Sequence, residues 1–112
     1  MTLRVMGGEL RGRKLVTPEG GTTRPTAARV REALFSMLGP IGGARVLDLC
    51  CGCGSLGIEA LSRGADEAVF VDDSIAAAAA ARTNIETFGI ADRATVLELD
   101  VVRAVQRLRE DG

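Results

Sequence analysis

Residues 46–57 read V-L-D-L-C-C-G-C-G-S-L-G, and this stretch decides the fold. Its apolar start, residues 46–49, predicts a short strand. The run Gly52-Cys53-Gly54-Ser55-Leu56-Gly57 has the pattern G-x-G-x-x-G, whose glycines permit a tight turn and let backbone approach a ligand closely. Residues 56–63 predict a helix, with Gly64 just past its end.

The same alternation continues towards the C-terminus. Residues 68–71 form a second apolar run, Ser74 is a predicted N-cap, and a long helix containing six alanines (residues 76–81) extends to Gly89. Residues 95–99 predict a third strand and residues 101–108 a last helix. Strands separated by helices predict an α/β fold with a parallel sheet of about three strands. We expect the inner face of the long helix to be formed by Ile75, Ala78, Ala79, Arg82, Ile85 and Phe88.

The first 40 residues have a different character. Residues 4–6 and 13–16 predict two short strands around a turn, and residues 17–25 predict a loop from their Pro and Gly content. Thr26 is a candidate N-cap for a helix that Gly39-Pro40 would end. Its expected apolar stripe is Val30, Leu34, Phe35 and Leu38. We therefore expect an N-terminal extension over residues 1–40 and a Rossmann-like half-domain over residues 41–112.

Charge divides the chain in the same way. Residues 1–45 have a net charge of +5 and residues 46–112 a net charge of −6. A basic segment joined to an acidic domain suggests contact with a polyanion, although balanced surface charge within one fold gives the same count.

Bulk composition excludes several classes of protein. The 112 residues include 46% apolar residues but only three aromatic ones, so we expect one domain with an aliphatic core. No apolar run is long enough to cross a membrane, and the N-terminus does not resemble a signal peptide, so a cytoplasmic location is expected. The chain has no His, and its Cys residues at 50, 51 and 53 form one tight group, which argues against a metal site.

An aspartate stands at the carboxyl end of each predicted strand: Asp48, Asp72 and Asp100. In open parallel sheets, ligands bind beyond the carboxyl ends of the strands. The glycine pattern followed by Asp72 makes a dinucleotide site a candidate, but Asp48 would repel a pyrophosphate. S-adenosylmethionine, which is cationic and has no phosphate, fits better: Asp48 would face its amino-acid end, Asp72 its ribose hydroxyls and Asp100 its adenine amine.

Each aspartate also has a purely structural interpretation. Asp48 would satisfy backbone N–H groups of the turn, whereas Asp72, Asp73 and Asp100 would cap helices.

The chain resembles a known family at residues 48–65, D-L-C-C-G-C-G-S-L-G-I-E-A-L-S-R-G-A. It is similar to the bacterial methyltransferases that modify a guanine N2 of small-subunit ribosomal RNA. The blocks R-V-M-G-G-E-L-R-G-R-K-L (residues 4–15) and T-R-P-T-A-A-R-V-R-E-A-L-F (residues 23–35) also match, as do V-F-V-D (residues 69–72) and Asn84.

The resemblance implies a Rossmann-like class I methyltransferase sheet, S-adenosylmethionine as cofactor and ribosomal RNA or the small ribosomal subunit as partner. It assigns the cofactor pocket to Asp48, Cys50, Gly52, Gly54, Asp72 and Asp100, with Arg24 and Thr26 in a turn that closes over cofactor or target base. It directs Arg4, Arg11, Arg13, Lys14, Arg29 and Arg31 towards RNA phosphates, in agreement with the charge division.

Two departures from the family pattern have consequences. Cysteines replace the aromatic and small residues usual in the glycine turn. The family's catalytic motif, Asn or Asp followed by Pro-Pro and an aromatic residue, has no counterpart, and no Pro follows Pro40. We expect that motif to lie beyond Gly112, so no catalytic residue is assigned, and we expect little or no methyl transfer from this chain alone. The first strand would lie at a sheet edge, which predicts self-association.

Two other functions remain open: an NAD(P)-binding oxidoreductase module, and an RNA-binding protein without catalysis. Titration with S-adenosylhomocysteine and with NAD separates the first from a methyltransferase.

Overall fold

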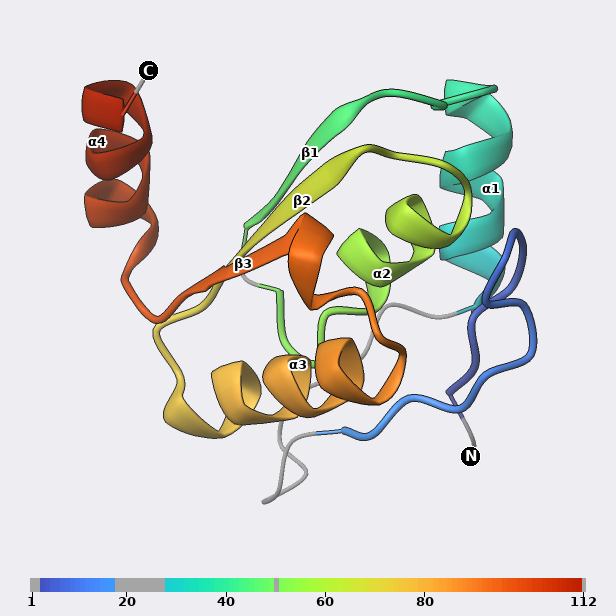
Figure 1. The fold of residues 1–112 in the computed structure, drawn as a ribbon, viewed down its shortest axis with the longest axis horizontal. Coiled ribbons are helices and arrows are strands. Elements are labelled where there is room, and N and C mark those ends of the chain that lie inside the picture. The colour runs from blue at the N-terminus through green and yellow to red at the C-terminus, as the bar shows by residue number, and fades with distance from the viewer. Residues whose placement is uncertain (1–2, 18–27, 50, 112) are drawn as a thin grey trace.

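A computed structural model describes residues 3–17, 28–49 and 51–111. Its helices are α1 (Ala28–Leu38), α2 (Ser55–Ser62), α3 (Ile75–Thr87) and α4 (Val101–Asp111), with a short 3-10 turn, η1 (Ala91–Arg93). Its strands are β1 (Arg45–Leu49), β2 (Glu67–Val71) and β3 (Ala94–Leu97). They form one parallel sheet in the order β1-β2-β3, as Figure 1 shows. The predicted α/β fold is confirmed.

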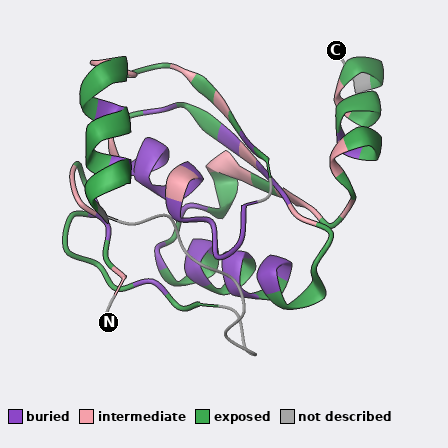
Figure 2. Cartoon of the chain, turned by 180° about the vertical axis from the view of Figure 1, so that it is seen from behind, coloured by how far each residue is buried: buried purple, intermediate pink, exposed green. Residues whose placement is uncertain are grey.

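The main core lies between the sheet and helices α2 and α3. Ile58 and Leu61 of α2 and Phe70 of β2 are completely buried, and Ala81 and Ile85 of α3 belong to the same cluster. Figure 2 shows buried residues concentrated on α2, α3 and β2, whereas α1 and α4 are mostly exposed and β1 and β3 are mostly exposed or partly buried. The core is mostly aliphatic, as the composition predicts, and includes the three phenylalanine rings Phe35, Phe70 and Phe88.

A glycine permits close packing between α2 and the sheet. A Cβ at Gly57 would lie 2.7 Å from Cζ of Phe70, well inside van der Waals contact. The third glycine of the pattern therefore allows helix and strand to approach each other, independently of any ligand.

The predicted capping residues of α2 and α3 are found at the ends of these helices. Ser74 Oγ accepts a hydrogen bond from the Ala77 N–H at 3.2 Å, so Ser74 is the N-cap of α3. Gly64, at φ 107°, follows the C-cap of α2.

The buried face of α3 differs from the expected one. Ala77, Ala78, Ala81, Asn84, Ile85 and Phe88 are buried, whereas Ile75, Ala79 and Arg82 are exposed. Because small alanines surround the apolar residues on all sides, hydropathy alone does not determine which face packs on the sheet. The polar side chain of Asn84 is part of the buried face.

The N-terminal residues form an arm, residues 3–17, that folds back on the domain. A single antiparallel bridge joins Arg4 and Lys14, and backbone bonds from Val5 N to Arg13 O (3.0 Å) and Gly12 N to Val5 O (2.8 Å) extend the pairing. The expected hairpin is thus present as one bridge rather than two strands. Val5, Leu10 and Leu15 are buried, which docks the arm on the domain.

The buried face of helix α1 differs from the expected apolar stripe. Phe35 is buried, but Val30, Leu34 and Leu38 are exposed. Arg31, one turn before Phe35, occupies the buried face instead, and its exposed fraction is 0%.

Strand β1 lies at an edge of the described sheet, with β2 as its neighbour, as expected. Leu47 and Leu49 of this strand are 44% and 42% exposed. Self-association through this edge stays a prediction.

Helix α4 extends away from the body of the molecule (Figure 1). In the part of the chain that the structure describes, we find no helix with the length and hydropathy needed to traverse a membrane.

Candidate functional site

The carboxyl ends of β1 and β2 meet at the glycine turn, residues 52–54. The Gly52 N–H donates to Asp72 Oδ2 at 2.9 Å, and the Cys51 N–H donates to the Val71 carbonyl at 2.7 Å. The turn is therefore tied to the end of the neighbouring strand. Gly54, at φ 88°, is the N-cap of α2, a left-handed conformation that glycine adopts without strain.

Asp48 lies beneath this turn and is only 6% exposed. Its Oδ2 accepts a hydrogen bond from the Gly57 N–H at 3.0 Å, in the first turn of α2. Burial raises the pKa of Asp48 to about 6, the Gly57 N–H opposes this rise, and the nearby Asp72 adds to it. A cation placed next to Asp48 would therefore stabilise the ionised form of its carboxylate.

Asp72 connects the turn to α3. While Oδ2 receives the Gly52 N–H, Oδ1 accepts a hydrogen bond from the Ser74 N–H at 2.9 Å. Asp72 is half-buried, so part of its carboxylate remains accessible.

Asp100 has a different setting. Its Oδ1 accepts a hydrogen bond from the Arg103 N–H at 2.8 Å, which makes it the N-cap of α4, and its Oδ2 lies 3.6 Å from Arg103 Nε. The structure thus brings Asp48 and Asp72 to one glycine-rich turn, Asp48 through the Gly57 N–H and Asp72 through the Gly52 N–H. The structural interpretation is realised for Asp48 and Asp100, whereas Ser74, and not Asp72 or Asp73, is the N-cap of α3.

The described cysteines are not nucleophiles in this setting. Burial raises the pKa of Cys51 to about 12, with smaller contributions from Asp48 and Asp72, and burial also raises the pKa of Cys53. Both thiols therefore stay protonated at neutral pH.

Arg24, Thr26, Cys50 and Gly112 lie outside the described residues, as do residues 18–25 of the predicted loop. The resemblance places Cys50 in the cofactor pocket and Arg24 and Thr26 in the turn that closes over cofactor or target base. Both assignments stay predictions.

Most residues assigned to RNA contact lie on the surface. Arg4, Arg11, Arg13, Lys14 and Arg29 are exposed. The guanidinium of Arg13 stacks over the Phe88 ring at 4.9 Å from its centre, and Arg4 Nη1 donates to the Gly12 carbonyl at 2.9 Å.

The expectation that Arg31 faces RNA is wrong, because its side chain lies in the interior. Its Nη1 donates to Glu59 Oε1 at 3.1 Å and its Nη2 donates to the Arg4 carbonyl at 2.9 Å, and both charged side chains are completely buried. A guanidinium paired in the interior is not available to a phosphate, because exposing it would leave Glu59 buried without this partner.

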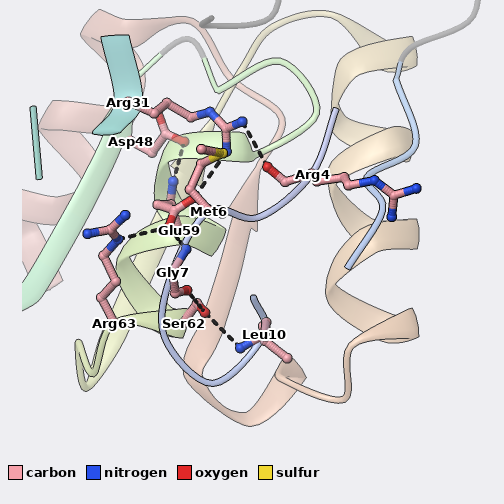
Figure 3. A network of polar contacts seen from close by, with 10 residues as sticks. Arg4, Met6, Gly7, Leu10, Arg31, Asp48, Glu59, Ser62 and Arg63 are labelled. Carbon is pink, nitrogen blue, oxygen red and sulfur yellow. Dashed lines mark hydrogen bonds and ion pairs between the residues drawn. The ribbon is translucent and has the colours of Figure 1, made fainter. Parts of the chain in front are cut away.

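Glu59 is the centre of a polar network that sequence reasoning missed (Figure 3). Besides Arg31, its carboxylate accepts bonds from the N–H groups of Met6 (2.8 Å) and Gly7 (2.9 Å) and from Arg63 Nε (2.8 Å). One carboxylate of α2 thereby holds the arm, α1 and the end of its own helix. A single acid among the apolar residues of α2 is the sequence signal that indicates such a buried role.

Ser62, one turn further along α2, holds the arm a second time. Its hydroxyl donates to the Gly7 carbonyl at 2.6 Å and accepts from the Leu10 N–H at 2.8 Å, as Figure 3 also shows. A Cβ on Gly8, at φ 78°, would overlap the backbone of Ser62, so the approach requires glycine.

Comparison with known proteins identifies the family. The family described as Conserved hypothetical protein 95 matches residues 3–112. The chain belongs to this family.

Two relatives and one solved structure show what the family contains. The chain is 42% identical over 113 residues to YlbH of Bacillus subtilis, whose name assigns it provisionally to the rRNA methyltransferases; the match covers 98% of this chain and 61% of YlbH. It is 49% identical over 71 residues to ribosomal RNA small subunit methyltransferase D of Escherichia coli K12, covering 62% of this chain and 36% of that protein.

The solved structure is the 16S rRNA N2 G1207 methyltransferase of Thermus thermophilus in complex with AdoMet and guanosine. It has a TM-score of 0.69 and 27% identity, and the match covers 93% of this chain and 28% of that one. The resemblance to bacterial small-subunit rRNA methyltransferases and the class I methyltransferase fold are therefore confirmed. The chain spans about three fifths or less of the length of these relatives.

Proposed function

We propose that this chain is the cofactor-binding part of an S-adenosylmethionine-dependent RNA methyltransferase that methylates guanine N2 in small-subunit ribosomal RNA. The observation that carries the proposal is that Asp48 and Asp72, at the carboxyl ends of two neighbouring parallel strands, each bind one end of the same glycine-rich turn, at Gly57 and Gly52. The names of two relatives, which are rRNA methyltransferase names, support the same class of reaction, and a similar protein of known structure was solved in complex with AdoMet and guanosine.

The chemistry of these groups fits the cofactor. Asp48 is a buried carboxylate whose pKa is raised to about 6, and an ammonium group beside it would relieve the cost of its charge. Asp72 offers carboxylate oxygens to ribose hydroxyls. Gly52 and Gly54 leave the turn without side chains, so a ligand can approach its backbone. Asp100 would reach the adenine amine only if it shared its carboxylate with the cap of α4.

When bound, S-adenosylmethionine would supply the methyl group on its sulfonium. The residues of this chain would hold the amino-acid end and the ribose and exclude a pyrophosphate, because two carboxylates repel that group. An NAD(P)-dependent function is therefore less compatible with the site.

RNA would approach over the basic arm, residues 3–17. Arg4, Arg11, Arg13 and Lys14 are exposed on it, and Arg29 is exposed on α1. Such contacts neutralise phosphates and position the RNA without reading its sequence. In this proposal residues 1–40 serve RNA approach and residues 41–112 bind the cofactor, and ribosomal RNA as substrate implies action in the cytoplasm.

Calorimetric titration tests the cofactor assignment. We expect S-adenosylhomocysteine to bind and NAD not to bind, with binding of S-adenosylhomocysteine lost in Asp72→Ala. Asp73→Ala is the matched control, because Asp73 is the exposed neighbour of Asp72 on the same turn. Binding of NAD in preference to S-adenosylhomocysteine would contradict the proposal.

RNA binding is tested by its salt dependence. Each phosphate contact contributes about 0.7–0.9 to the slope of log affinity against log salt. Replacing Arg11, Arg13 and Lys14 together by alanine should therefore lower the slope by about 2 to 3. An unchanged slope would exclude the arm as the RNA surface. A non-catalytic RNA-binding role predicts the same lowering of the slope by these substitutions, but it predicts no binding of S-adenosylhomocysteine.

A further inference from the structure

Asn84 of α3 is a buried polar residue that uses its whole side chain on backbone groups. It is 1% exposed. Its Oδ1 accepts a hydrogen bond from the Val16 N–H at 2.8 Å, and its Nδ2 donates to the Val16 carbonyl at 2.9 Å and to the Cys53 carbonyl at 3.0 Å. Both N–H bonds of the amide and its carbonyl oxygen therefore have partners.

These partners belong to two different parts of the proposed site. Val16 lies near the end of the basic arm and is 51% exposed, and its backbone N–H and carbonyl are hydrogen-bonded to α3 through Asn84. Cys53 is the middle residue of the glycine turn, between Gly52 and Gly54. One amide group thus touches both the arm that would meet RNA and the turn that would meet the cofactor.

We propose that Asn84 is a positioning residue that couples the arm to the glycine turn, so that RNA on the arm and cofactor in the turn each strengthen binding of the other. The inference rests on the proposed function. The physical basis is that one planar amide holds three backbone groups in a fixed relation. A ligand that orders the arm holds Val16, and through Asn84 it reduces the motion of Cys53; a ligand in the turn has the reverse effect.

The three hydrogen bonds of Asn84 require a side chain that has both a carbonyl oxygen and an NH₂ group. Aspartate has the same shape and still accepts the Val16 N–H, but it cannot donate to the two carbonyls and would place a carboxylate oxygen against them. Asn84→Asp therefore breaks the connection while conserving volume. Thr83→Ala is the matched control, because Thr83 is the exposed neighbour on α3 and its hydroxyl donates within the helix, to Ala79 O at 3.0 Å.

The deciding experiment measures binding of S-adenosylhomocysteine by calorimetry with and without a short hairpin RNA. In the unmodified chain and in Thr83→Ala we expect RNA to tighten binding about fivefold or more, the usual lower range for coupled sites. In Asn84→Asp we expect this ratio to fall to about one. A merely structural role for Asn84 would weaken both affinities and leave the ratio unchanged, which would overturn the inference.

Hydrogen exchange on the unmodified chain provides a second test that does not depend on folding of the variant. RNA alone should slow exchange at the amides of residues 51–54, and S-adenosylhomocysteine alone should slow exchange at Val16. Absence of both effects overturns the inference. If the chain binds both ligands without coupling, only this inference fails; if it binds neither, the proposed function fails with it.

Discussion

Replacing Asp48 by asparagine tests whether this carboxylate is present for a ligand rather than for the fold. The asparagine amide has the same shape, and its oxygen can keep the hydrogen bond from the Gly57 N–H, which Asp48 Oδ2 accepts at 3.0 Å. The substitution therefore removes the buried charge and leaves the packing of the turn unchanged. We expect a more stable protein that binds its cofactor less well.

The magnitude follows from the raised pKa of Asp48. Burial, with a smaller contribution from Asp72, moves this pKa from 3.8 to about 6. The folded protein thus holds the proton more tightly than the unfolded chain does. The ionised form consequently costs folding free energy, which is absent below pH 3.8, grows as the pH rises through the window to pH 6, and is complete above it. Two pH units correspond to about 3 kcal/mol.

Urea unfolding of both proteins at pH 4 and pH 7 measures this difference. Since the new NH₂ group must also be buried, at a cost of about 1–2 kcal/mol, we expect Asp48→Asn to be more stable at pH 7 by about 1–2 kcal/mol. Towards pH 4, where Asp48 is largely protonated, this advantage should be lost, and Asp48→Asn should become the less stable protein by about 1 kcal/mol because its NH₂ group is still buried. Asp66→Asn, at an exposed position, is the control and should change stability by less than about 0.5 kcal/mol.

Ligand binding should respond in the opposite sense. S-adenosylhomocysteine has an ammonium group, so its affinity for the unmodified chain should fall as the pH is lowered through about 6, and Asp48→Asn should be weaker at pH 7 and lose this pH dependence. A variant that is less stable than the unmodified chain at pH 7, or that has the same pH profile of stability, would refute the reasoning.

Three further substitutions test the framework around the site, each by urea unfolding. Glu59→Gln should cost about 3–5 kcal/mol, because it leaves the buried Arg31 without its ionic partner; a cost below 1 kcal/mol would show that the network is not important for stability. Gly57→Ala should cost about 1–3 kcal/mol by overlap with Phe70, and reducing Phe70 to leucine in the same chain should recover part of the loss. Ser74→Ala should cost about 1 kcal/mol through loss of the α3 cap, and no change would mean that the cap is replaced.

Local features of this protein follow from the sequence because their causes are local. The strand–turn–helix at residues 46–64, the Ser74 cap and the three parallel strands depend on apolar runs, glycines and capping residues a few positions apart. The convergence of Asp48 and Asp72 also follows, since consecutive parallel strands place their carboxyl ends at one edge.

Which face of each helix is buried cannot be predicted from the sequence, because periodicity indicates a helix but not the elements that pack against it. In α1 the apolar stripe of Val30, Leu34 and Leu38 is exposed, and Arg31 is buried instead. A charged residue is stable there only because Glu59, 28 positions away, meets it.

The sequence by itself determined the order of the elements, the glycine turn and the aspartates at the strand ends, since each depends on residues within about one turn or strand of one another. Only the tertiary structure decided that Glu59 holds the arm and that Asn84 joins the arm to the turn. Those bonds connect residues 31 to 68 positions apart, and no local pattern encodes which distant backbone group will meet a buried side chain.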